Sequence, residues 1–174
     1  MAHDASLEEI LATLERSAWS GHVFRVMLGD YPPHRENTLG ARWNPPEIAA
    51  IYVSLAAETA VAEIEYNLKR QPQRVKPGLR KTLYEIEVSL GAVVDLEEVL
   101  PELRKIGIDH AQLFADDLKA SQEIGRLVTW FGADGLLVPS ARAAGKNLVI
   151  YPRWAGDGYR FEVVKFRERA KVSE

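Results

Sequence analysis

The sequence of 174 residues contains no cysteine, which excludes a disulfide scaffold, a thiolate metal site and a cysteine nucleophile. No apolar run approaches the roughly 20 residues that a membrane-spanning helix needs. The start, MAHDASLEEI, also lacks the basic and then apolar layout of a signal peptide. We therefore expect a cytoplasmic protein that has no contact with membranes.

Several nucleotide and metal motifs are missing as well. The four histidines lie far apart, and neither HExxH nor an EF-hand loop occurs, so we expect no metal site. Neither GxGxxG nor GxxxxGK[ST] is present, and Ser140 stands in VPSAR instead of a GxSxG turn. Dinucleotide-binding Rossmann folds, P-loop NTPases and α/β-hydrolases are therefore disfavoured.

Charge is nearly balanced, with a formal net charge of −3. Binding to a phosphate backbone needs a basic face, so no direct nucleic-acid binding is expected. One stretch differs, because Lys69–Lys81 (KRQPQRVKPGLRK) is basic and holds no acidic residue. Such a stretch is most often a solvated loop; the alternative is a docking patch for an anionic ligand or an acidic partner.

Apolar residues make up 47% of the chain and charged residues 27%, as in ordinary globular proteins. We predict a compact α/β (α+β) fold in one domain, 1–174, with an N-terminal helix (1–17), a core (18–166) and a frayed tail (167–174). Periodicity and turn residues predict strands at Gly21–Leu28, Ile48–Ser54, Leu83–Leu90, Gly135–Pro139, Leu148–Tyr151 and Tyr159–Phe166. Helices are predicted from Ser6 to Ser17 and at Glu97–Ile106, Ala111–Lys119 and Ser121–Phe131.

The stretch Gly40–Glu65 combines a turn, a strand and a helix. Arg42 precedes the paired prolines of the turn, and Ser54 is a candidate N-cap for the helix. On that helix Val61, Ile64 and Leu68 form an apolar stripe.

Two glutamates of this helix differ in their neighbours. Glu65 has Lys69 four residues on, as on a solvated surface. Glu63 shares its face with Ala56, Thr59 and Ala60, and these small side chains leave open space before its carboxylate. Glu63 is therefore the better candidate for a pocket wall.

The candidate site residues all lie at the end of an element or on such a face; they are Arg25, Arg42, Tyr52, Glu63 and Ser140. Each also has an ordinary structural explanation. Arg25 fits a surface arginine of a strand and Arg42 a structural arginine at a turn. Tyr52 fits a core tyrosine, Glu63 an exposed helix glutamate and Ser140 a cap of its own loop.

Five segments together resemble the RES-domain family, the toxins of bacterial toxin–antitoxin pairs. They are FRV (Phe24–Val26), GARWNPP (Gly40–Pro46), IYVS (Ile51–Ser54), AxxE (Ala60–Glu63) and GLLVPSAR (Gly135–Arg142). Their order and spacing resemble the family from Phe24 to about Pro152. Two features depart from the pattern: Glu47 stands where a glycine is common, and the basic loop Lys69–Lys81 is an addition.

The resemblance implies a fold related to diphtheria-toxin-like ADP-ribosyltransferases and a toxin that cleaves NAD at the nicotinamide–ribose bond, as a glycohydrolase or phosphorylase. By motif position, Glu63, Arg42 and Ser140 would be catalytic. The residues holding NAD would be Arg25, Arg42, Tyr52 and Ser140. NAD would be the substrate, no metal would be needed, and a cognate helix-turn-helix antitoxin would be the partner.

Two alternatives stay open at this stage. An ADP-ribosyltransferase would pass the same ribosyl group to a cellular protein, and sequence barely separates it from a glycohydrolase. A catalytically silent module would instead bind its partner through the basic loop, Lys69–Lys81. The loss of an arginine, glutamate or serine of the motif would mark such a module, and none is lost here.

Overall fold

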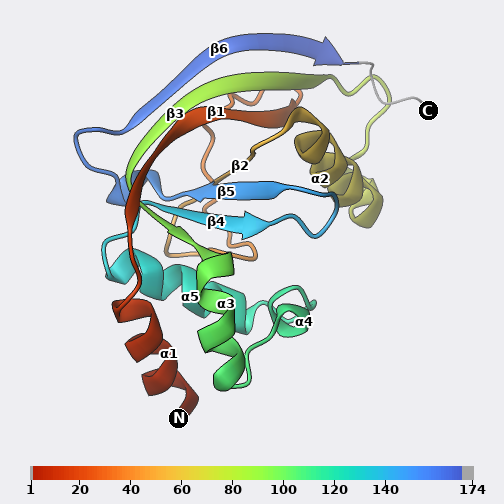
Figure 1. The fold of residues 1–174 in the computed structure, drawn as a ribbon. Coiled ribbons are helices and arrows are strands. Elements are labelled where there is room, and N and C mark those ends of the chain that lie inside the picture. The colour runs from red at the N-terminus through yellow and green to blue at the C-terminus, as the bar shows by residue number, and fades with distance from the viewer. Residues whose placement is uncertain (1, 170–174) are drawn as a thin grey trace.

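The computed structural model of the protein describes residues 2–169, and it shows a mixed α/β fold (Figure 1). The helices are α1 (Ala2–Ala12), α2 (Ala57–Arg70), α3 (Leu96–Lys105), α4 (His110–Leu113) and α5 (Lys119–Trp130). The strands are β1 (Ser17–Leu28), β2 (Ile51–Ser54), β3 (Lys81–Asp95), β4 (Gly135–Pro139), β5 (Lys146–Ile150) and β6 (Arg160–Arg169). Two short 3₁₀ turns cover Pro72–Arg74 and Pro152–Trp154.

The six strands follow the order β1-β2-β5-β4-β3-β6, and a further pairing of β1 with β3 closes the first five into a ring. Strand β3 makes this possible because it is long enough to have different neighbours along its length. Its first part lies between β1 and β6, and Val93–Asp95 then pairs in parallel with Gly135–Leu137 of β4. The result is two layers, β6-β3-β1 and β2-β5-β4, which lie one above the other in Figure 1.

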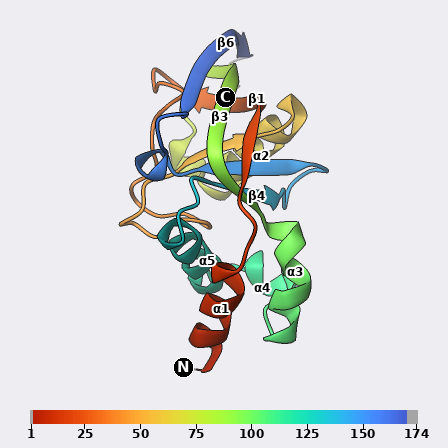
Figure 2. The ribbon, with the colours of Figure 1, turned by 60° about the vertical axis from the view of Figure 1, so that its left-hand side comes forward.

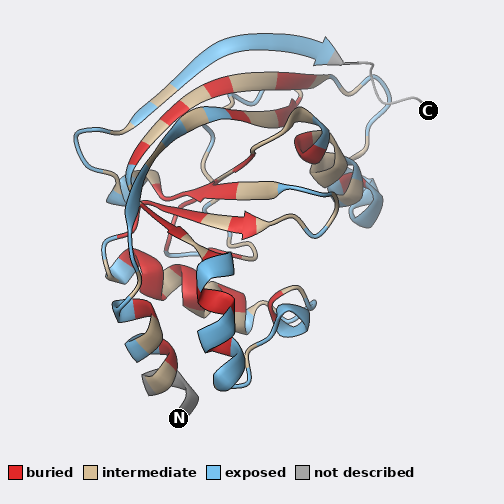
Figure 3. Cartoon of the chain, in the orientation of Figure 1, coloured by how far each residue is buried: buried red, intermediate tan, exposed pale blue. Residues whose placement is uncertain are grey.

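The two layers enclose one apolar core, and the helices cover a second. Val23, Ile86 and Ile150 are fully or almost fully buried between the layers. On the other face of β4 and β5, Leu136, Val138 and Val149 pack with residues of α1, α3 and α5. These helices gather on one side of the strands in Figure 2, and Figure 3 shows the buried positions along both layers. Because Gly135–Val138 of β4 and Leu148–Ile150 of β5 are covered on both faces, these parts of the strands are apolar throughout.

Helix α5 approaches the turn that carries Arg42 very closely. A Cβ on Gly125 would lie 2.0 Å from the carbonyl oxygen of Trp43. The buried hydroxyl of Tyr151 donates a 2.8 Å hydrogen bond to the same oxygen. Only glycine allows this approach, so α5 and the end of β5 together fix the position of the turn.

Helix α2 begins later than predicted, and Ser54 does not cap it. The N-cap is Ala56, which makes no side-chain capping bond. Ser54 instead donates a hydrogen bond to Asn147 of β5, because it is the last residue of β2 and faces its partner across the ladder. The predicted apolar stripe is confirmed: Val61 and Ile64 pack against Val26 and Leu83, and Leu68 is buried.

Other predicted boundaries are corrected by the structure. The helix predicted at Ala111–Lys119 is wrong, because α4 ends at Leu113 and α5 begins only at Lys119. Asp109 caps the short helix α4, and Asp117 accepts a hydrogen bond from the amide of Lys119, where α5 begins. Strand β2 begins at Ile51 instead of Ile48, since residues 48–50 form a turn and a bridge to Asn37.

Both ends of the chain also differ from the prediction. Helix α1 ends at Ala12 instead of Ser17, and Ser17 opens β1. The helix also starts at Ala2, four residues before the predicted start at Ser6. The predicted frayed tail, 167–174, is in part ordered, because residues 167–169 pair with β3; residues 170–174 lie outside the described part of the chain. Among the helices of residues 2–169, none has the length and apolar character that crossing a membrane would take.

Candidate active site

The side chains of Glu63 and Ser140 meet beside the end of β5. The hydroxyl of Ser140 donates a 2.7 Å hydrogen bond to Glu63 Oε1, and Asn147 Nδ2 donates a second of 2.8 Å to the same oxygen. Helix α2 supplies the carboxylate, the loop after β4 supplies the serine, and β5 supplies the asparagine. Two donors therefore fix one carboxylate oxygen. Hydrogen bonds to a charged acceptor are stronger than those between neutral groups, so this oxygen is firmly held.

The second oxygen of Glu63 is left available. No described residue donates a hydrogen bond to Glu63 Oε2, and among the described residues no buried side-chain nitrogen or oxygen lacks a partner. Glu63 Oε2 therefore faces solvent. A carboxylate held at one oxygen and open at the other can contact a ligand without reorganising.

A tight loop, 140–145, holds Ser140 in place. The Ser140 hydroxyl accepts hydrogen bonds from the amides of Arg142 and Ala143, at 3.1 and 3.2 Å. The loop closes through a bond from the amide of Ser140 to the carbonyl of Gly145, whose φ of +119° suits only glycine. Thr59, one turn before Glu63 on α2, donates a hydrogen bond to the carbonyl of Ala144. Loop and helix are thus joined next to the carboxylate.

Thr59 and Ala60 do not form the open wall that the sequence suggested. Both are buried, Thr59 under loop 140–145 and Ala60 against Val26 and Leu83. The small side chains let α2 approach the loop and β1 closely. The solvent-facing side of Glu63 results from the geometry of its hydrogen bonds.

Asn147 was missed in the sequence. The hydroxyl of Ser54 donates a 2.7 Å hydrogen bond to Asn147 Oδ1, so the amide presents its NH₂ group to Glu63. Ser54 and Asn147 are paired in the β2–β5 ladder. A signal was present, since an asparagine directly before the apolar run Leu148–Ile150 needs a polar partner.

Arg42 lies near Arg142 of the serine loop and holds the turn after α4. Its Nη1 donates to the carbonyls of Leu113 and Ala115, at 2.9 and 2.8 Å, and its guanidinium lies 5.7 Å from the ring of Phe114. Burial, and next the positive charge of Arg142, lower the pKa of Arg42. Nε and Nη2 have no hydrogen-bond partner among the described residues, and so they face solvent.

Arg142 and Tyr66 extend the site beyond the predicted residues. The guanidinium of Arg142 lies 3.3 Å above the ring of Tyr66, a cation–π contact. Tyr66 follows Glu63 by three residues on α2, so both lie on one face of the helix. That spacing could have identified Tyr66 from the sequence, whereas Arg142 was identified only as part of the serine loop.

The ring of Tyr52 belongs mainly to the scaffold of the turn. Its hydroxyl accepts a 2.9 Å hydrogen bond from the amide of Trp43 and donates one of 2.7 Å to Asn44. Burial raises the pKa of Tyr52, while the bond from Trp43 and the charge of Arg42 oppose this shift. Tyr52 therefore lies near Arg42, and its hydroxyl proton is already donated to Asn44.

The structure does not bring Arg25 together with Glu63. Phe24 packs against α2, and Arg25, the next residue of β1, points to the opposite face of the strand. Its Nη1 donates to the carbonyls of Pro33 and Arg35. Burial, and next the charge of Arg35, lower the pKa of Arg25 to about 10. Arg25 thereby fixes the loop that follows β1.

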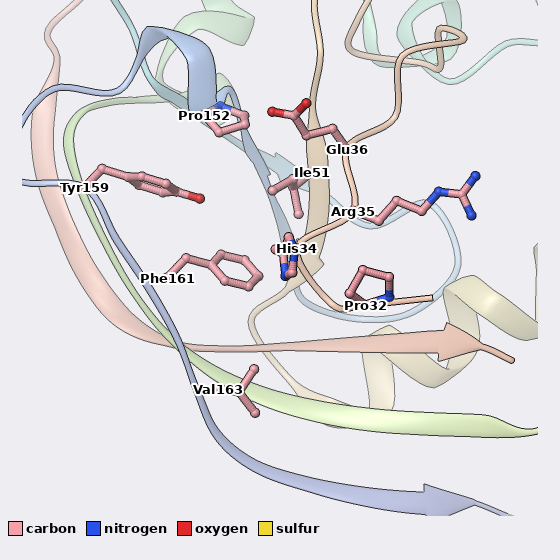
Figure 4. Close-up of a pocket in the computed structure, with 9 residues that line it drawn as sticks. All are labelled: Pro32, His34, Arg35, Glu36, Ile51, Pro152, Tyr159, Phe161 and Val163. Atoms are coloured by element: carbon pink, nitrogen blue, oxygen red, sulfur yellow. The ribbon is translucent and has the colours of Figure 1, made fainter. Parts of the chain in front are cut away.

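The loop fixed by Arg25 forms one wall of a hollow of about 500 Å³, shown in Figure 4. Tyr159, Phe161 and Val163 line the opposite side. The guanidinium of Arg35 points away from the hollow and lies 3.6 Å from the ring of Tyr31. None of the residues that line the hollow belongs to the group around Glu63.

Basic side chains of Lys69–Lys81 are mostly exposed. Arg70 forms an ion pair with Asp116, and Arg80 forms one with Asp30. Arg74 and Lys76 lie near Tyr31 and contribute to lowering its pKa, after the hydrogen bond and charge of Arg35. The basic loop is thus partly neutralised at its two ends and free of acidic partners in its middle, within the described residues.

Comparison with known proteins gives a consistent assignment of the fold. The model of the RES domain family matches residues 16–172. Proteins called "NAD(+) phosphorylase MbcT", from Mycobacterium tuberculosis and Mycobacterium bovis, are 29% identical over 116 residues. The match covers 64% of this chain and 61% of each relative, so it spans about three fifths of their length.

A solved structure is similar over nearly the whole chain. It is described as the crystal structure of the M. tuberculosis MbcT–MbcA toxin–antitoxin complex. The TM-score is 0.79 at 22% sequence identity, and the match covers 96% of this chain and 93% of the other. At this identity the likeness concerns the fold.

Proposed function

Because this chain belongs to the RES-domain family, we propose that it is the toxin of a toxin–antitoxin pair and cleaves NAD between nicotinamide and ribose. Its relatives named NAD(+) phosphorylase support this proposal. The observation that carries it is the Glu63 carboxylate, which two donors fix at Oε1 and which faces solvent at Oε2.

The chemistry suits a single carboxylate. Nicotinamide bound to ribose carries a positive charge, and when the C–N bond breaks it leaves neutral with the bonding electron pair. No general acid is needed, in contrast to ordinary glycosides, which use two carboxylates. Positive charge develops on the ribose, and Glu63 stabilises it more strongly in the transition state than in the ground state. An acceptor oxygen then forms the new bond at the same carbon.

Further residues fill the remaining roles in this proposal. Ser140 orients Glu63 or a ribose hydroxyl, and Arg42 offers its free Nε and Nη2 edge to the diphosphate of NAD. Tyr52 supplies an aromatic ring near Arg42 for nicotinamide. The sequence assigns Arg25 to NAD as well; its contacts with the Pro33 and Arg35 carbonyls support an indirect role through the loop they fix.

The acceptor decides the class of reaction. Attack by phosphate dianion gives a phosphorylated ADP-ribose, and attack by water gives ADP-ribose and a proton. The names of the relatives favour phosphate. An ADP-ribosyltransferase, which passes the ribosyl group to a protein, is the alternative within the same chemistry. A silent binding module is disfavoured because the arginine, glutamate and serine are all present.

A partner and a place of action complete the proposal. The similar structure of a toxin–antitoxin complex supports a cognate antitoxin, which we propose is a helix-turn-helix protein that occludes the site. The basic loop Lys69–Lys81 is a further candidate contact for an acidic face of this partner. Action in the cytoplasm fits an enzyme that depletes the NAD of the cell and a chain without cysteine.

The finer fold assignment is also a proposal. We infer a relationship with diphtheria-toxin-like ADP-ribosyltransferases, supported by the two packed layers of three strands. We further propose that residues 1–174 act as one RES-like domain, because the two apolar cores share strands β4 and β5. No group of metal-ligating side chains occurs among the residues with a described placement.

Nicotinamide release from NAD by the purified protein tests the proposal. Reactions run with and without phosphate and with cell lysate separate the outcomes. Phosphorylated ADP-ribose means phosphorolysis, free ADP-ribose means hydrolysis, and label fixed to a lysate protein means transfer. If nicotinamide appears under none of these conditions, with antitoxin absent, the enzyme assignment fails.

A further inference from the structure

Half-buried arginines without a carboxylate partner mark an unusual region of this protein. The structure describes four arginines of intermediate burial, Arg25, Arg42, Arg126 and Arg142. Arg126 is paired with Glu123, whereas no described carboxylate lies within ion-pair distance of the other three; the charge of Asp116 acts on Arg42 without such a contact. A partly desolvated guanidinium without a carboxylate in direct contact is costly, and an anionic ligand would offset that cost.

Arg142 is held where it can meet such a ligand beside Glu63. Its backbone amide donates to Ser140, which in turn donates to Glu63, and its guanidinium lies 3.3 Å from the ring of Tyr66. The ring supports one face of the guanidinium and uses none of its N–H groups. These groups have no partner among the described residues, so they face solvent.

Arg42 lies near the same tyrosine and near Arg142, since the charges of both act on its guanidinium. Its Nη1 is bonded to the carbonyl of Ala115, and the next residue, Asp116, forms an ion pair with Arg70. Arg70 in turn donates a hydrogen bond to the hydroxyl of Tyr66. This chain of contacts places Arg42 and Arg142 around Tyr66, and each presents unused N–H groups to solvent.

We propose that Arg42 and Arg142 form an anion site beside the Glu63 carboxylate, and that it binds a phosphate group. Planar guanidinium forks match the oxygen pairs of a phosphate, which favours this class of anion over a simple halide. The site serves the proposed function in one of two ways. It holds either the diphosphate of NAD or the inorganic phosphate that attacks the ribose.

A substitution of Arg142 gives the clearer test of the site. Its guanidinium makes no hydrogen bond within the described residues, whereas Arg42 also supports the turn after α4. Arg142→Gln removes the charge and the fork, and Arg142→Lys keeps the charge alone. Arg104→Gln is the matched control, because Arg104 is an exposed arginine at the end of α3 with no described ion pair. A thermal melt of each variant shows that the fold is kept.

Binding is measured first by calorimetry, without any turnover, using inorganic phosphate and ADP-ribose as separate probes. Arg142→Gln is expected to weaken at least one of them about 10-fold or more, Arg142→Lys less, and Arg104→Gln neither. Kinetics then separate the sources. A raised KM for phosphate alone identifies the attacking phosphate, and a raised KM for NAD, also without phosphate, identifies the diphosphate.

Unchanged affinity of Arg142→Gln for both probes would overturn the anion site. This failure is distinct from failure of the proposed function. Wild-type protein that binds a probe through Arg142 but releases no nicotinamide would support the anion site and reject the enzyme.

Discussion

Glu63 and Ser140 are 77 positions apart in the sequence, yet their side chains share a 2.7 Å hydrogen bond. The hydroxyl of Ser140 also accepts two backbone hydrogen bonds from its own loop, so its single proton is directed to the carboxylate. This arrangement keeps Glu63 at a fixed position next to Arg142 and Tyr66.

We expect Glu63→Gln to lower kcat about 100-fold to 1000-fold and to leave the fold intact. The neutral amide cannot stabilise positive charge on ribose, and losses of this size are usual when an electrostatic transition-state contact is removed. The variant opens no cavity, because glutamine has the same shape. Nicotinamide release and a thermal melt give the two measurements.

Glu65→Gln is the control for that variant, since Glu65 is exposed on the same helix. Its activity should match the wild type. Equal loss in both variants, or unfolding of Glu63→Gln, would remove Glu63 from the proposed mechanism.

How much of the site could be predicted from the sequence depends on the distance between its parts. Glu63 and its helix followed from the apolar stripe of α2 and from the neighbours of each glutamate. The meeting of Glu63 with Ser140 was expected only from the family resemblance, because no local pattern links segments that far apart. Asn147 could have been found from the pairing of Ser54 in β2.

Other contacts had no signal in the sequence. Arg42 donates hydrogen bonds to the carbonyls of Leu113 and Ala115, more than 70 residues away. Every residue has a main-chain carbonyl, so the sequence does not indicate which carbonyls an arginine will bond. The same region was predicted to be one helix, but α4 ends at Leu113, and Asp117 accepts a hydrogen bond from the amide of Lys119 where α5 begins. Propensity favoured a helix there, and local side-chain bonds to the backbone decided against it.

Gly125→Ala is predicted to destabilise the fold by about 1 to 3 kcal/mol, as overpacked cores do. The new Cβ would lie 2.0 Å from the carbonyl oxygen of Trp43, a backbone atom that cannot move freely. A chain of this size should lose roughly 2 to 4 °C in Tm per kcal/mol. Activity of the surviving folded protein should also fall, because the displaced turn carries Arg42.

For comparison, Gly156→Ala introduces a Cβ with no atom within 4 Å. Its Tm should stay the same or rise slightly, since alanine restricts the unfolded chain. Equal Tm values for the two alanine variants would show that α5 and the turn do not depend on this close approach.

Arg42→Lys should raise the KM for NAD about 10-fold. Lysine can still donate to the Leu113 and Ala115 carbonyls, but it lacks the second edge that Arg42 leaves free for the diphosphate. KM is measured in nicotinamide-release assays at saturating acceptor. An unchanged KM would return Arg42 to a structural role at the turn after α4.

Arg25→Lys should also weaken NAD binding, but together with a lower Tm. Arg25 is half-buried and bonds to the carbonyls of Pro33 and Arg35, so its loss frees the loop as well. The affinity for NAD and the melting curve are measured on the same preparation. A lower Tm with unchanged affinity would show that Arg25 serves the loop alone.

The last prediction concerns Asn147, which donates to Glu63 Oε1 and is oriented by Ser54. Asn147→Ala should lower kcat about 10-fold with little change in the KM for NAD, because one of two charge-assisted hydrogen bonds to the carboxylate is lost. Ser54→Ala should have a smaller effect in the same direction, since the amide then loses only its orienting partner.

Asn147→Asp gives the more decisive result through the pH dependence of kcat. It places a second carboxylate within hydrogen-bond distance of Glu63, and two like charges there raise the pKa of the pair. In the proposed mechanism the carboxylate of residue 63 acts in its ionised form, so the acid limb of the pH profile should move to higher pH by about one unit or more, as for other close carboxylate pairs. Gln73→Glu, which adds a carboxylate at an exposed position in the 3₁₀ turn after α2, is the control and should leave the profile unchanged. An acid limb that stays in place in Asn147→Asp would mean that Asn147 does not position the reacting carboxylate.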